Sequence, residues 1–154
     1  MRDASAVVAL MDGLTICVPT VPGFAALKLS AWASRSAFGE YRDGTDIACA
    51  MYWYTVDAGV TERLYDPEGD LELLLRHELD HQTAAVELLV RDALRTLDAD
   101  HRRVLLALWM SSGAGACTHL LAQTLRAPHL PGWPADARRL QRLAAIVSEV
   151  FGER

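Results

Sequence analysis

Residues 21–47 read VPGFAALKLSAWASRSAFGEYRDGTDI, and this stretch decides the fold class. Pro22 suits the first turn of a helix, so the sequence predicts one helix from there to about Ser36. A break around Gly39 follows, and a second helix is expected from near Asp43 to about residue 58. The short connection over residues 37–42 would return the second helix against the first. The stretch therefore predicts a pair of packed helices.

The flanking sequence extends the same pattern. Residues 59–65 favour a helical turn, and apolar residues recur at helical spacing from Asp70 almost to the end. Upstream, residues 4–11 favour a short helix and residues 14–18, LTICV, a strand. We expect a mainly α protein, a helical bundle with one or two short N-terminal strands. We expect the aromatic residues 52–54 to pack in the core rather than stack on a base.

Bulk composition limits the function classes. The chain has 154 residues, enough for one domain, with 51% apolar and 23% charged residues. A net charge of −5 argues against a protein that binds nucleic acid by bulk charge, although a local basic patch leaves that partner open. Three cysteines without a CxxC pair predict a reducing cytoplasm and no disulfide framework. No apolar run approaches the ~20 residues of a membrane span, so we expect no membrane.

Two cations lie within the apolar face of the first helix. At about 100° per residue, Lys28 and Arg35 fall on the same face as Phe24. Asp43 and Asp46 are neighbours on the first turn of the next helix. Such an arrangement suits a phosphate site, where cations hold phosphate oxygens and carboxylates hold Mg²⁺ or accept a proton. The structural alternative is that the aspartates form a capping box and the cations extend their stems to water.

The same residues carry a family resemblance. The run from Val21 to Arg35, followed by Arg-Asp-Gly-Thr-Asp-Ile over residues 42–47, resembles bacterial nucleotidyltransferase-like proteins similar to the AbiEii abortive-infection toxins of type IV toxin–antitoxin systems. Leu-Leu-Val-Arg-Asp at residues 88–92 is similar to a later helix of that family. The resemblance covers roughly residues 1–97. It implies nucleotide transfer to a hydroxyl acceptor with Mg²⁺ and a nucleoside triphosphate as cofactors.

The resemblance also assigns roles to residues. Lys28 matches the active-site lysine, and Asp43 or Asp46 matches the late active-site aspartate. Arg35 and Arg42 would bind phosphate. Within a single mostly helical domain over 1–154, residues 1–20 would be a short helix and strand of a nucleotidyltransferase core, 21–97 the family-like helices and 98–154 the C-terminal helices.

One motif of that family is missing from the sequence. No Gly-Ser dipeptide occurs, and the only Asp-x-Asp is formed by Asp98 and Asp100, late in the chain. We therefore expect a split or truncated enzyme that is inactive alone, with an N-terminal nucleotidyltransferase half or an antitoxin as partner in trans. The alternative is a noncatalytic interaction module, which a large apolar surface near residues 4–18 would favour. A homo-oligomer stays open.

A second motif points to different chemistry. His77, Glu78 and His81 fit HExxH, which on a helix would place both histidines on one face for Zn²⁺ with Glu78 as general base. Asp80 adds a charge between the ligands, and Glu87 stands where an extended motif would have a third histidine. A zinc hydrolase is therefore kept as the alternative enzyme hypothesis.

Overall fold

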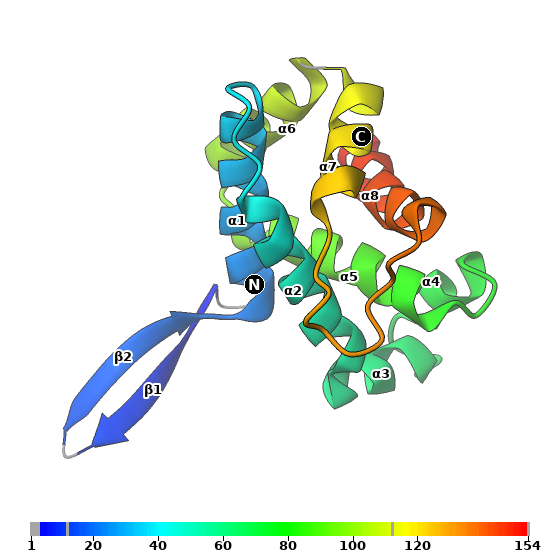
Figure 1. Ribbon diagram of the computed structural model, residues 1–154. Coiled ribbons are helices and arrows are strands. Elements are labelled where there is room, and N and C mark those ends of the chain that lie inside the picture. The colour runs from blue at the N-terminus through cyan, green and yellow to red at the C-terminus, as the bar shows by residue number, and fades with distance from the viewer. Residues whose placement is uncertain (1–3, 12, 112, 154) are drawn as a thin grey trace.

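The predicted pair of helices over residues 21–47 is present. The computed structural model describes residues 4–11, 13–111 and 113–153 of the chain. Helix α1 (Val21–Ser36) begins after Thr20, whose hydroxyl accepts a hydrogen bond from Gly23 N at 3.3 Å. Helix α2 (Asp43–Val56) then runs back along α1 (Figure 1). The fold class predicted from the sequence, mainly α with short N-terminal strands, is confirmed for the described residues.

Six further helices complete the described body. They are α3 (Ala58–Tyr65), α4 (Leu71–Arg76), α5 (His81–Thr96), α6 (Ala99–Ser111), α7 (Ala114–Thr124) and α8 (Ala137–Gly152). Helix α5 is the most buried, and α1, α2 and α8 pack around it. Trp32 of α1 and Trp109 of α6 are fully buried with ring centroids 5.4 Å apart.

Within the described ranges, no single helix combines the length and apolarity that a membrane span needs. Helices α6 and α7 have the length and apolarity of a span only when they are taken together, and the pair is bent by 95° at the break between them.

The N-terminal residues form a β-hairpin. Strands β1 (Ser5–Met11) and β2 (Leu14–Pro19) are antiparallel, with Ser5 opposite Pro19 and Val8 opposite Ile16. The predicted strand at residues 14–18 is confirmed, but the predicted helix at residues 4–11 is wrong. Gly13, with φ of 82°, lies in the reversal between the strands, and pairing with β2 overrides the local preference of an Ala- and Leu-containing segment.

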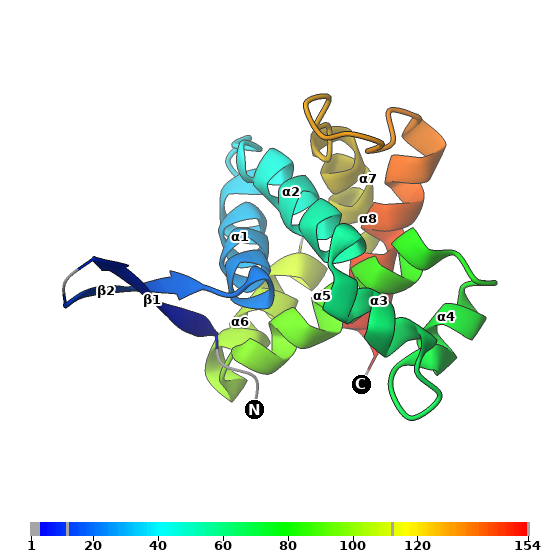
Figure 2. The ribbon, with the colours of Figure 1, turned by 90° about the horizontal axis from the view of Figure 1, so that it is seen from below.

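The described residues of the hairpin contact the helices at its base. Thr20 N donates to Ala4 O at 3.0 Å, and a Cβ on Gly23 would lie 2.2 Å from the same oxygen. Glycine at position 23 therefore lets the backbone cross close over α1. Beyond this crossing the hairpin extends away from the bundle, and all of its described residues are exposed (Figures 1 and 2).

A non-helical turn separates α4 from α5. Helix α4 ends at Arg76 and α5 begins at His81, while Glu78 and Leu79 have φ of 53° and 65°. Leu79 N donates to Leu74 O at 2.9 Å, which closes the end of α4. The continuous helix across residues 77–81 that the HExxH interpretation requires is therefore absent, and the prediction of a helix at this position is wrong.

Candidate functional site

Four predicted site residues meet where α1 and α2 pack together. Lys28 Nζ lies 3.2 Å from Asp43 Oδ1 and 2.7 Å from Asp46 Oδ2. Arg35 Nη1 lies 2.7 Å from Asp43 Oδ2. We call these four residues the α1–α2 charge cluster. The sequence placed the cations on one face of α1 and the acids on the first turn of α2, and the fold brings the two pairs into contact.

The two aspartates have different surroundings. The Asp43 side chain is 3% exposed, and each of its oxygens faces one cation. The Asp46 side chain is 45% exposed and contacts only Lys28 within the cluster. Asp43 is therefore held as an anchor for the two cations, whereas Asp46 is open to a ligand from solvent.

Electrostatic interactions keep Asp43 and Lys28 charged. Burial raises the pKa of the Asp43 carboxyl, but hydrogen bonds from Arg35 and Lys28 outweigh it and lower the pKa below the ordinary value. The pKa of Lys28 is raised, chiefly by its hydrogen bond to Asp46. Both groups are ionised at neutral pH.

The capping alternative is not observed at α2. Its N-cap residue is Arg42, and no side chain makes a capping hydrogen bond there. The acids instead lie in the first helical turn, where a negative charge also interacts favourably with the helix dipole. The position of Asp43 is therefore explained by its two cationic partners.

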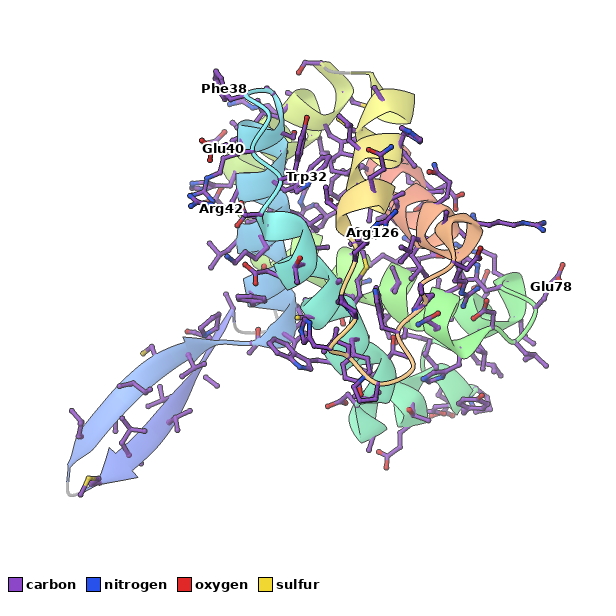
Figure 3. All side chains as sticks on the ribbon, in the orientation of Figure 1. Trp32, Phe38, Glu40, Arg42, Glu78 and Arg126 are labelled. Carbon is purple, nitrogen blue, oxygen red and sulfur yellow. The ribbon has the colours of Figure 1, made fainter. Side chains whose placement is uncertain are left out.

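Arg42 does not join the cluster. Its side chain is 74% exposed, and the nearest carboxylate is that of Glu40 at 4.0 Å. Both side chains project from the connection between α1 and α2 (Figure 3). A phosphate-binding role for Arg42 stays a prediction that would need the long side chain to swing toward Arg35.

A second polar group was missed by the sequence analysis. The Asp92 side chain has no exposed surface, and its Oδ2 lies 2.7 Å from Arg63 Nη1 and 2.5 Å from the Tyr54 hydroxyl. Burial lowers the pKa of Arg63, but the buried carboxylate beside it raises that pKa above the ordinary value. A signal was present in the charged Arg-Asp pair within the apolar run at residues 88–92.

A hollow on the surface adjoins this second group rather than the charge cluster. It has a volume of 720 Å³ and lies between the base of the hairpin, the start of α1 and the α2–α3 corner. Tyr54 and Arg63 provide part of its lining, and the described hairpin residues Ser5, Ala6 and Val7 form another wall. Because this wall is an exposed hairpin, the hollow is an open recess beside it.

The HExxH residues are engaged elsewhere. His77 Nε2 lies 2.5 Å from Glu87 Oε2, and His81 Nε2 lies 2.9 Å from the Thr55 carbonyl oxygen. Glu78 points away from the bundle (Figure 3). In the part of the chain that the structure describes, no three His, Cys, Asp or Glu side chains are grouped to hold a metal. The arrangement does not resemble a zinc-hydrolase centre.

Comparison with models of protein families, with curated proteins and with solved structures gave no match to this chain. Two cations fixed by one buried carboxylate, beside a second carboxylate open to solvent, can bind a phosphate group and an associated divalent cation.

Proposed function

We propose that the α1–α2 charge cluster binds the phosphates of a nucleoside triphosphate as one part of a nucleotidyl-transfer site. The observation that carries the proposal is the convergence of Lys28 and Arg35 on the buried carboxylate of Asp43. A fixed anchor holds both cations in place before a ligand arrives, which lowers the entropic cost of binding. The resemblance of residues 21–47 to AbiEii-like nucleotidyltransferases supports the same assignment.

Each residue of the cluster has a role in this proposal. Lys28 and Arg35 donate to phosphate oxygens, and Asp43 is a positioning residue because both of its oxygens are occupied. Mg²⁺ in nucleotide sites is commonly held by one or two carboxylates together with substrate phosphates. Asp46, with its half-exposed carboxylate, suits the protein's share of that set. The metal would neutralise charge on the phosphates.

The cluster by itself is electrically balanced, with two cations and two anions. A phosphate must therefore bring a divalent cation with it or loosen the contact between Lys28 and Asp46. That contact is the easier one to open, because Asp46 is 45% exposed whereas Asp43 is 3% exposed. The proposal thus predicts that phosphate binding depends on Mg²⁺.

Transfer chemistry needs further carboxylates. The Asp-x-Asp of this sequence lies at the start of α6, where Asp98 Oδ1 accepts a hydrogen bond from His101 N at 2.8 Å and Asp100 pairs with Arg103. We propose that a partner segment, similar to the N-terminal half of a nucleotidyltransferase, supplies the metal-binding carboxylates. We place this assembly in a reducing cytoplasm. Robust labelled-nucleotide transfer by residues 1–154 alone would contradict this part of the proposal.

Calorimetric titration with Mg²⁺–ATP tests the phosphate site. A charge-assisted hydrogen bond contributes about 1.5–3 kcal/mol, so Lys28→Met and Arg35→Met should each weaken binding by at least about tenfold. Arg103→Met is the matched control, because Arg103 is 78% exposed and, among the described residues, pairs with the exposed Asp100 alone. Thermal melts establish that each variant is folded. Equal affinity of the wild type, both cluster variants and the control would refute the proposal.

The hairpin supports a second candidate function, an interaction module. Val8, Ile16 and Val18 share one face of the hairpin, and they are 40%, 40% and 38% exposed. On the other face, Val7 is 70% exposed. Strands that are apolar on both faces are typical of a sheet covered on both sides, and the described strand residues include no charge that would discourage edge pairing.

We propose that, in this second function, the hairpin associates with a second copy of the chain. Sedimentation velocity should show self-association of the wild type that rises with concentration. The double variant Val8→Asp, Ile16→Asp should be monomeric, because it introduces two charges opposite each other on the apolar face. A wild type that is monomeric at every concentration would contradict this candidate and leave the phosphate site untouched.

A further inference from the structure

Trp53 differs from the other tryptophans of the chain. Trp32, Trp109 and Trp133 are 0%, 0% and 8% exposed, and each indole N–H donates a hydrogen bond. Trp53 is 46% exposed, and its indole N–H has no hydrogen-bond partner among residues 4–11, 13–111 and 113–153. Core packing therefore explains three tryptophans and does not explain the fourth.

The neighbours of Trp53 link it to the charge cluster. Its ring centroid lies 5.9 Å from that of Phe24, with the planes at 44°. Lys28 Nζ lies 5.6 Å from the Phe24 centroid, so Phe24 contacts both Trp53 and the lysine of the charge cluster. We call Phe24 and Trp53 the aromatic pair.

Helix geometry places the aromatic pair and the charge cluster in line. Trp53 follows Asp46 by seven residues, so both lie on one face of α2 about 10 Å apart along its axis. Phe24 and Lys28 are one turn apart on α1. The packed helices therefore present aromatic rings at one end of their shared face and fixed cations at the other.

We propose that Trp53, supported by Phe24, stacks on the base of the nucleotide whose phosphates lie at Lys28 and Arg35. This inference depends on the proposed phosphate site and adds recognition of the nucleoside. Stacking on an aromatic ring tolerates any base, because every base has a π face. The ligand class is therefore a nucleoside triphosphate with weak discrimination among bases.

The alternative partner for the exposed Trp53 side chain is a polypeptide that covers it. The nucleotide is favoured because the aromatic pair continues directly into a cluster of preset cations, with Lys28 shared between them. The expectation that residues 52–54 all pack in the core holds for Tyr54, which is 5% exposed, but not for Trp53.

Two probes separate base recognition from phosphate recognition. Calorimetry compares Mg²⁺–ATP with Mg²⁺–tripolyphosphate, which lacks the nucleoside. The wild type should bind ATP about tenfold more tightly than tripolyphosphate. Trp53→Leu should remove that difference, and Trp53→Phe should retain most of it. Phe38→Leu is the matched control, since Phe38 is 85% exposed at the far end of α1 from the hairpin (Figure 3).

The outcomes distinguish the inference from the function on which it depends. Loss of the ATP preference in Trp53→Leu, with unchanged tripolyphosphate binding, is the expected result. A wild type that binds both probes equally, or a Trp53→Leu variant that keeps the preference, overturns the stacking inference while the phosphate site stands. Both proposals are overturned if neither probe binds, or if Lys28→Met leaves the affinity for both probes unchanged.

Discussion

Replacing Asp43 by asparagine removes the anchor of the charge cluster while nearly preserving the shape of the side chain. The Asp43 side chain is 3% exposed, and its two oxygens face Lys28 at 3.2 Å and Arg35 at 2.7 Å. In the variant the amide group turns a donor toward one of the two cations. The change therefore converts two attractive contacts into one weak contact and one unfavourable contact.

The magnitude follows from burial. Breaking a fully buried ion pair costs about 3–5 kcal/mol. Here the side chains of Lys28 and Arg35 are 27% and 41% exposed, so water replaces part of what the carboxylate provided. We expect a loss of about 2 kcal/mol in the free energy of unfolding. With a urea dependence of about 2 kcal/mol per molar, the unfolding midpoint should fall by about 1 M.

Asp46→Asn is the matched control for that prediction. The same substitution on the same helical turn removes the same interaction with the helix dipole. Asp46 is 45% exposed and contacts only Lys28 within the cluster, so its loss should cost less than about 1 kcal/mol. Urea unfolding followed by circular dichroism gives both values. Equal losses in the two variants, or a larger loss in Asp46→Asn, would refute the distinction between anchor and open ligand.

Three further predictions concern the rest of the fold. Arg139 lowers the pKa of Asp80 below its ordinary value of 3.8, so the stability that this carboxylate contributes is complete above that value and is lost as pH falls through the folded-state pKa. In urea unfolding, the free energy of unfolding should therefore fall less between pH 5 and pH 3 in Asp80→Asn than in the wild type. Gly44→Ala should lower the free energy of unfolding by about 1–3 kcal/mol, because a Cβ would lie 2.3 Å from a side-chain oxygen of α7. Gly115→Ala, where a Cβ would meet nothing within 4 Å, should be neutral or stabilising in the same assay. Similar losses in the two variants would contradict close packing at Gly44. Asp92→Asn should lower the thermal midpoint by several degrees, since the buried carboxylate accepts hydrogen bonds from Tyr54, Arg63 and Arg95. An unchanged midpoint would show that these contacts of Asp92 do not stabilise the fold.

Local signals were sufficient for the helices that carry the site. The proline near the start of α1, the glycine in the connection and the acidic first turn of α2 all lie within residues 21–47. The charge cluster was predictable for the same reason, because helical spacing determines which side chains share a face. That these residues bind a nucleotide remains a prediction.

Other features depended on partners distant in the sequence. The segment 4–11 contains good helix formers and becomes a strand only through pairing with residues 14–19. The break at Glu78 and Leu79 carries neither glycine nor proline, so nothing local marks the left-handed backbone there. Three consecutive aromatics at residues 52–54 point in directions about 100° apart, and only the packing of α2 decides that Trp53 faces outward.

The most direct test of the central claim is the location of bound nucleotide on the chain. Titration of the ¹⁵N-labelled protein with Mg²⁺–ATP, followed by amide and indole chemical shifts, reports every affected residue at once. We expect the largest shifts at Lys28, Arg35 and Asp46 and at the indole N–H of Trp53. No shifts at saturating nucleotide, or shifts confined to other arginines such as Arg76 and Arg142, would contradict it.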